Sequence, residues 1–170
     1  MEITENPKCK TNIISLRLIS RNIKLYIQSY ESLKEIEFDF YNEIINLKDT
    51  LPIFNNNSSI IFKSLTHFNF KNFDKKGISY SILNNIYNNI DNMPNLKEFK
   101  LSCYSKDIDE CFYKKLIKKI LLLNLDYIDL NIKKNYHEYK ESDNYTLKEF
   151  NEMFPELNLL NINKTFIKKF

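Results

Sequence analysis

The side chains with the greatest potential for chemistry in this sequence are one cysteine and one histidine. Cys103 and His67 would make a nucleophile and its general base if they met, because a nearby imidazole activates a thiol. However, Cys103 follows the two-residue periodicity of the surrounding apolar positions, whereas His67 falls between such positions. We therefore expect a buried structural thiol, an imidazole on the opposite face, and no catalytic pair.

Other catalytic and cofactor-binding patterns are missing from the sequence. Gly77 is the single glycine, which excludes a dinucleotide fingerprint or a phosphate-cradling loop, since both need several glycines. His67 and His137 are far apart, and no two cysteines are separated by two residues, so the ligand spacing of a zinc site is absent. We expect no enzymatic activity, no metal and no cofactor.

Four lysines flank an apolar stripe in one predicted helix: Lys114, Lys115, Lys118 and Lys119. This pattern occurs in helices that bind nucleic acid or an anionic membrane surface. It also occurs in ordinary solvated helices, and here Asp109 and Glu110 precede the lysines, an order that complements the helix dipole. We favour helix stabilisation and keep anion-surface binding as an alternative.

Composition and charge restrict the class of protein. The 170 residues include 25 basic and 22 acidic side chains, a balance that disfavours nucleic acid as a partner. The odd number of cysteines fits free thiols in a reducing compartment, and no secretory signal is recognisable, so we expect a cytoplasmic or nuclear protein that is not secreted. The longest apolar run is far too short for a transmembrane segment.

The strongest signal in the sequence is an internal repeat. A leucine followed by apolar residues three and five positions later occurs five times: Leu33-Ile36-Phe38, Leu65-Phe68-Phe70, Leu96-Phe99-Leu101, Leu125-Ile128-Leu130 and Leu157-Leu160-Ile162. Successive leucines are 32, 31, 29 and 32 residues apart, which leaves room for one strand and one helix in each repeat.

The periodicity changes within each repeat. Alternation of apolar and other residues through each triplet predicts a strand with one buried face, extending to Phe40, Asn72, Cys103 and Ile132. Helical periodicity follows over residues 78–90 and 112–121, and a shorter helix from residue 147 begins with a capping box formed by Thr146 and Glu149. A weak helix is expected over residues 41–51 and an exposed loop over residues 55–59.

The triplets, the intervening helices and the Pro-x-Leu sequences at Pro94 and Pro155 resemble the leucine-rich-repeat family, particularly its ribonuclease-inhibitor-like class. That resemblance implies an α/β fold, a short right-handed solenoid with parallel strands on one face and helices on the other. The position that holds a ladder Asn or Cys in the family carries other residues here: Tyr41, Phe73, Tyr104 and Lys133.

The predicted organisation is one domain. Residues 1–32 form an N-terminal cap, either a hairpin of 14–18 with 23–27 or a decayed first repeat. Residues 33–163 form about five strand-helix repeats, and residues 164–170 are a tail that caps the last repeat. If the tail does not cap it, that C-terminal edge is open to self-association.

Parallel strands would align the residues between the buried positions into columns across one exposed sheet face, the usual binding surface of the family. The predicted partner-binding residues are Glu35, His67, Glu98, Tyr127 and Leu159 in the first column, Glu37, Asn69, Lys100, Asp129 and Asn161 in the second, and Asp39 and Lys71 in the third. Tyr127 beside Leu159 is the preferred anchor.

The three carboxylates of residues 35, 37 and 39 are expected along an edge strand, where they either contact a basic partner or protect the edge. The favoured function is a non-catalytic module that binds another protein through the strand face. The alternatives are a nucleic-acid or membrane-surface binder acting through the lysines of residues 114–119, and a structural fragment of a longer repeat protein.

Overall fold

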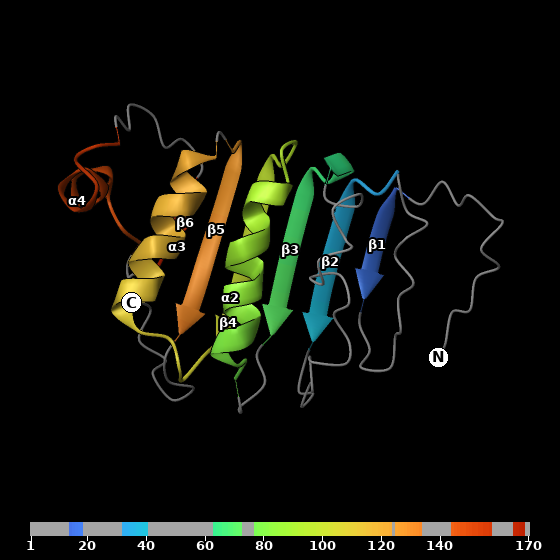
Figure 1. Ribbon diagram of the computed structural model, residues 1–170, viewed down its shortest axis with the longest axis horizontal. Helices are drawn as coiled ribbons and strands as arrows, with labels where there is room; N and C mark the ends of the chain where they lie inside the picture. The colour runs from blue at the N-terminus through green and yellow to red at the C-terminus, as the bar shows by residue number, and fades with distance from the viewer. Residues whose placement is uncertain are drawn as a thin grey trace, which may run out of the picture.

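A computed structural model describes residues 14–18, 32–40, 63–72, 77–123, 125–133, 144–157 and 165–168. Six strands form one parallel sheet in chain order (Figure 1): β1 (Ser15–Leu18), β2 (Glu35–Phe40), β3 (His67–Asn72), β4 (Glu98–Tyr104), β5 (Tyr127–Lys133) and β6 (Thr165–Ile167). The predicted α/β class with a parallel sheet is therefore confirmed. Four of the five apolar triplets each lead into one strand of the sheet.

The strand pairing joins equivalent positions of successive repeats. Ile36 pairs with Phe68, Phe68 with Phe99, and Phe99 with Ile128. A slip of one residue would move every apolar side chain of a strand to the opposite face, so burial holds the register in place. Each triplet consequently occupies the same layer of the molecule as the triplets on either side.

The buried face of the sheet carries an aromatic ladder. Phe68 is 1% exposed, and its ring lies 6.1 Å from the ring of Phe38 and 5.4 Å from that of Phe99, measured between centroids. Cys103 is fully buried at the end of this face, as predicted, and pairs in register with the buried Asn72. The sequence contains no alanine and no valine, so bulky aromatic rings fill much of the core.

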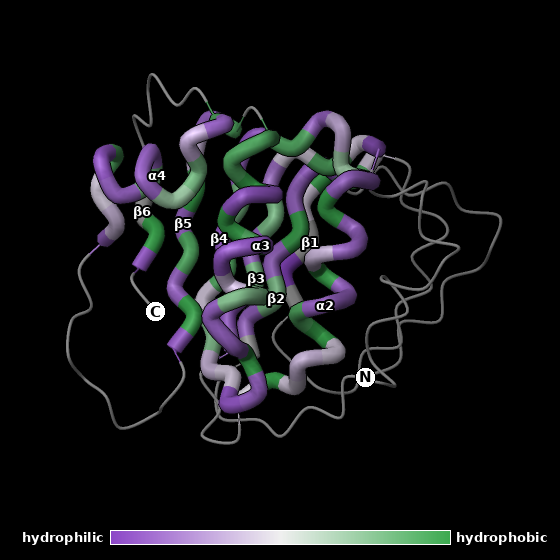
Figure 2. The backbone as a smooth tube through the Cα atoms, turned by 60° about the vertical axis from the view of Figure 1, so that its left-hand side comes forward, coloured by the Kyte–Doolittle hydropathy of each residue, from purple (hydrophilic) through white to green (hydrophobic). Residues whose placement is uncertain are grey.

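Two helices, α2 (Tyr80–Asn89) and α3 (Glu110–Leu122), lie over the same face of the sheet in Figure 1. Their apolar stripes face inward: Leu83 and Ile86 of α2 and Leu116 of α3 are fully buried. Figure 2 shows the same division as hydrophobic and hydrophilic stretches alternating along both helices. A 3₁₀ turn, η3 (Ile90–Asn92), ends the first helical segment.

Side chains cap the starts of α3 and α4 (Leu147–Met153). The Asp109 carboxylate accepts a hydrogen bond of 2.6 Å from the Phe112 backbone N–H. The short helix α4 begins with the predicted capping box: the Glu149 carboxylate accepts from the Thr146 N–H at 2.8 Å, and the Glu149 N–H donates to the Thr146 hydroxyl at 3.3 Å.

The N-terminal strand β1 runs parallel to β2, with Ser15 paired to Glu35 and Leu18 to Phe38. Parallel pairing is what the decayed first repeat predicts. The second arm of the alternative hairpin, residues 23–27, lies outside the described residues.

The C-terminal strand corrects the prediction for the fifth repeat. β6 is Thr165–Ile167, and Ile167 pairs with Leu130, the position that the repeat assigned to Ile162. The strand therefore begins five residues later than predicted and lies in the segment predicted to be a tail. Ile167 is fully buried beside Leu130 of β5.

Segment 144–145 lines the outer side of β6. The Tyr145 N–H donates to the Ile167 carbonyl at 2.8 Å, and Asn144 forms an antiparallel bridge with Lys168. The Tyr113 hydroxyl of α3 donates to the Lys168 carbonyl at 2.5 Å from the other direction. Backbone groups that a terminal strand leaves free are thus partly satisfied within the chain.

Other predictions fall outside the described residues: the helix over 41–51, the loop over 55–59, and the strand-face positions Leu159 and Asn161. No described helix combines the length and the apolar character needed to cross a bilayer.

Candidate functional site

The sheet face opposite the helices is polar and half-exposed, since intermediate positions alternate with buried ones along β3 and β5. The pairing aligns the predicted columns: Glu35, His67, Glu98 and Tyr127 are consecutive partners across four strands, and so are Glu37, Asn69, Lys100 and Asp129. We call this surface, residues 35–39, 67–71, 98–102 and 127–131 with their side chains directed away from the core, the strand face. Its alignment is confirmed, and partner binding by its residues stays a prediction.

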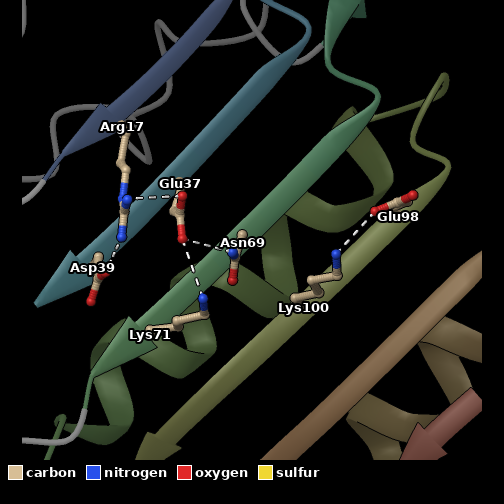
Figure 3. A network of polar contacts seen from close by, with 7 residues as sticks. All are labelled: Arg17, Glu37, Asp39, Asn69, Lys71, Glu98 and Lys100. Atoms are coloured by element: carbon tan, nitrogen blue, oxygen red, sulfur yellow. Dashed lines mark hydrogen bonds and ion pairs between the residues drawn. The ribbon is translucent and has the colours of Figure 1, made fainter.

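The strand that carries Glu35, Glu37 and Asp39 is not an edge strand, contrary to the prediction. β1 lies beside it and supplies Arg17, whose guanidinium lies 3.3 Å from the Glu37 carboxylate and 2.6 Å from that of Asp39 (Figure 3). The two carboxylates in turn raise the pKa of Arg17, first through its hydrogen bond with Asp39. Two of the three acids are therefore neutralised within the chain.

Glu37 is the centre of the polar network drawn in Figure 3. Its Oε1 accepts a hydrogen bond from the Asn69 amide at 3.0 Å and lies 3.3 Å from the Lys71 ammonium group, while its Oε2 faces Arg17. Strands β1, β2 and β3 are thus linked on this face by side chains as well as by backbone pairing. The arrangement positions these groups but leaves Glu37 little capacity for an external donor.

A second, smaller group joins β4 to β5. The Lys100 ammonium lies 3.1 Å from the Glu98 carboxylate and 4.8 Å from the centre of the Tyr127 ring, a cation–π contact. Asp129 is half-buried beside these groups, and desolvation raises the pKa of its carboxyl although Lys100 acts in the opposite direction. Tyr127 is thereby held in a fixed orientation at the end of the first column.

Exposure falls along β2. The side chains of Glu35, Glu37 and Asp39 are 51%, 27% and 16% exposed, respectively. His67 is 40% exposed, and its ring nitrogens lie 3.9 Å from the Glu35 carboxylate and 3.6 Å from that of Glu98. Exposure changes little along β3 and β4, where Lys71 and Lys100 are 39% and 35% exposed, so Glu35 is what makes the first column more open to a partner.

Cys103 and His67 lie on opposite faces of the sheet, as expected. Cys103 is fully buried, and burial raises the pKa of its thiol, which keeps the sulfur in its unreactive neutral form. His67 instead contacts the Thr66 hydroxyl at 2.8 Å on the strand face. The two side chains cannot form a nucleophile and its base.

The preferred anchor, Tyr127 beside Leu159, stays a prediction, because Leu159 lies outside the described residues. The strand next to β5 is Thr165–Ile167, and its register places Phe166, rather than Asn161, beside Asp129. Tyr127 remains in the candidate site.

The lysines of α3 are mostly compensated. Lys114 lies 2.8 Å from Glu110 and Lys119 lies 2.8 Å from Asp91, while Lys118 forms an ion pair with Glu156. This pairing favours helix stabilisation over the binding of an anionic surface.

Sequence reasoning missed Arg17 as a member of the strand face. The signal was present, since the alternation of Ile14, Leu16 and Leu18 places Arg17 on the opposite side of the same strand. Residues 14–18 do not lie one regular repeat before the triplet at Leu33, so the spacing did not align Arg17 with the columns.

Comparison with known proteins supplies no family for this chain: no family model, no curated protein and no solved structure matches it. Among the described residues, no group of three His, Cys, Asp or Glu side chains is arranged to hold a metal ion. The candidate site therefore stands on its own geometry.

Proposed function

We propose that the chain is a short right-handed solenoid of leucine-rich-repeat type that binds another protein, without catalysis, through the strand face. The observation that carries the proposal is the exact register of the first column, which lines up Glu35, His67, Glu98 and Tyr127 on one open surface. The repeat spacing, the parallel sheet and the helices over one face support the solenoid.

The chemistry of the first column fits a partner that presents basic side chains beside an apolar or aromatic one. Glu35 is the most exposed of the four carboxylates compared on the face, and its contact there is with the His67 ring, whose Nδ1 lies 3.9 Å from the carboxylate. An arginine or lysine of the partner could form an ion pair with this exposed carboxylate. Tyr127 offers a rigid aromatic contact at low entropic cost.

The test uses two charge-matched double variants. Glu35→Lys with Glu98→Lys reverses the first column, and Glu110→Lys with Glu152→Lys makes the same charge change on the helices, where both carboxylates are 65% exposed. A photo-crosslinking residue at His67 identifies the partner, whose affinity for the three proteins is then measured with purified components.

We expect the strand-face variant to weaken binding by about tenfold or more, a loss of about 1.4 kcal/mol, and the helix variant to bind like the unchanged protein. Equal affinities for both variants would remove the strand face from the interface. A loss confined to the helix variant would assign the interface to the opposite side.

Binding of nucleic acid or a membrane surface through α3 is the weaker alternative, because three of its four lysines have carboxylate partners. We retain it as an outcome: binding to heparin that falls steeply with salt and is lost on Lys114→Gln with Lys115→Gln would support it. The third hypothesis, a fragment of a longer repeat array, predicts marginal stability of residues 1–170 alone.

A further inference from the structure

A recess of about 660 Å³ opens at the edge of the sheet from which the strands start, the upper edge in Figure 1. Segments that lead into β2, β3 and β4 line it, and they supply three lysines: Lys34, Lys63 and Lys97. Its volume lies within the range of roughly 300–1,000 Å³ that is typical of small-molecule sites. We call it the lysine recess.

The three lysines differ from most of the lysines described above. Five lysines of the strand face and of α3 lie within 4.0 Å of a carboxylate: Lys71, Lys100, Lys114, Lys118 and Lys119. Among the described residues, no carboxylate lies this close to Lys34, Lys63 or Lys97. All three lysines are exposed, so their ammonium groups are available to a ligand.

The single acid of the lining does not cancel this charge. Asp91 is the one acidic residue among the described lining residues, and its carboxylate lies 2.8 Å from the Lys119 ammonium group. Three uncompensated positive charges around one concave surface attract an anion of more than one charge. Because all three lysines line one recess, the geometry favours a compact anion over a nucleic-acid strand.

Part of the lining of the recess is apolar. Pro94 is exposed and Leu123 is partly exposed, whereas Met93 and Leu96 are almost fully buried, at 1% and 7%. The Thr66 hydroxyl donates to the Lys34 carbonyl at 3.0 Å and is not free for a ligand. The recess therefore offers a ligand ammonium groups together with a small apolar surface.

We infer that the lysine recess binds a small phosphorylated compound, with the phosphate on Lys34, Lys63 and Lys97 and its organic part against Pro94 and Leu123. Lysine binds phosphate as a point charge and needs no fixed donor geometry. The inference is independent of the strand face and of the protein partner proposed for it.

The test is calorimetric titration of the full chain with inorganic tripolyphosphate, 1-naphthyl phosphate and neutral 1-naphthol. The variant carries Lys34→Gln, Lys63→Gln and Lys97→Gln. The control carries Lys114→Gln, Lys115→Gln and Lys118→Gln, which removes the same charge from α3. Far-UV circular dichroism and the unfolding midpoint of both variants establish that the fold is retained.

We expect both phosphates to bind the unchanged protein and the α3 control, with dissociation constants about tenfold or more higher for the recess variant, and naphthol not to bind. Naphthyl phosphate should perturb the backbone amide resonances of Met93 and of residues 95–97. Equal weakening in both variants, or no binding of either phosphate, would overturn the inference. So would binding of a single-stranded oligonucleotide or anionic vesicles, dependent on the three lysines, without binding of the small phosphates.

Discussion

Replacement of Gly77 by alanine tests the turn between β3 and α2. Gly77 has a φ of +71°, in the left-handed region that residues with a Cβ rarely adopt. A Cβ built there would lie 2.9 Å from the carbonyl oxygen of Tyr104, whereas the neighbouring Ile78 N–H donates to that same oxygen at 2.7 Å. The single glycine of the sequence thus stands where backbone conformation and close packing both require it.

The magnitude follows from these two effects. A left-handed conformation costs a non-glycine residue about 1–2 kcal/mol, and the lower entropy of the unfolded alanine chain returns about 0.4–1 kcal/mol. The contact with backbone oxygen adds to the cost, because neither Tyr104 nor Ile78 is free to move without lengthening their hydrogen bond. We expect the Gly77→Ala variant to lose about 1–3 kcal/mol of unfolding free energy.

Urea denaturation followed by far-UV circular dichroism measures this loss. Asn88→Ala, on the exposed side of α2, is the control and should change stability by less than about 0.5 kcal/mol. Gly77→Asn should fall between the two, since asparagine tolerates the left-handed region but keeps the Cβ contact. A Gly77→Ala variant as stable as the original protein would refute the described turn.

Three further predictions concern the core and the buried ionisable groups. Phe68→Ala removes the middle ring of the aromatic ladder and should cost about 3–5 kcal/mol in urea denaturation, because the rigid neighbours cannot close the cavity. Tyr113→Phe removes the donor to the Lys168 carbonyl and should cost about 1–2 kcal/mol near neutral pH. Burial raises the pKa of Tyr113, so folding stability should fall as pH rises above about 10, and the phenylalanine variant should lose less over that interval. At pH 8 a thiol reagent should modify the exposed Cys111 and leave the buried Cys103 unmodified until urea is added, as peptide mass spectrometry would show.

The parallel sheet was predictable because apolar periodicity reports directly on burial. Leu33, Leu65 and Leu96 are all buried at the entrances of successive strands, and the two-residue alternation after them identified the faces correctly. The capping box at Thr146 was also predictable, because it depends on local residues three positions apart.

The two ends of the sheet were predicted less well, for a common physical reason. A strand is recognised by repetition, and β1 and β6 lie at departures from the regular spacing, β6 beginning five residues late. Leu160 and Ile162 had the right pattern for a strand, but Thr165–Ile167 pairs with β5, and Ile167 fills the layer beside Leu130. Sequence pattern alone does not decide between two nearby apolar segments that compete for one edge.

The polar contacts of the candidate site were only partly predictable. Which residues share a column follows from the two-residue alternation along each strand, and this predicted the first four members of the first column. The pairing of Glu37 and Asp39 with Arg17 depends on which strand adjoins β2, and strand order is a property of the tertiary structure. The lysine recess escaped prediction altogether, since Lys34, Lys63 and Lys97 belong to three different segments.

Disulfide formation between introduced cysteines tests the central claim most directly, namely that equivalent positions of successive repeats are neighbours on one face. In a chain with Cys9→Ser and Cys111→Ser, the pair Asn69→Cys and Lys100→Cys occupies directly paired positions, and Asn69→Cys with Asp129→Cys spans two strand intervals. Neighbouring strands lie about 4.8 Å apart, within the range that a disulfide bridges, whereas two intervals exceed it. We predict rapid intramolecular oxidation of the first pair and none of the second. Oxidation of the second pair but not the first would contradict the parallel register on which the strand face depends.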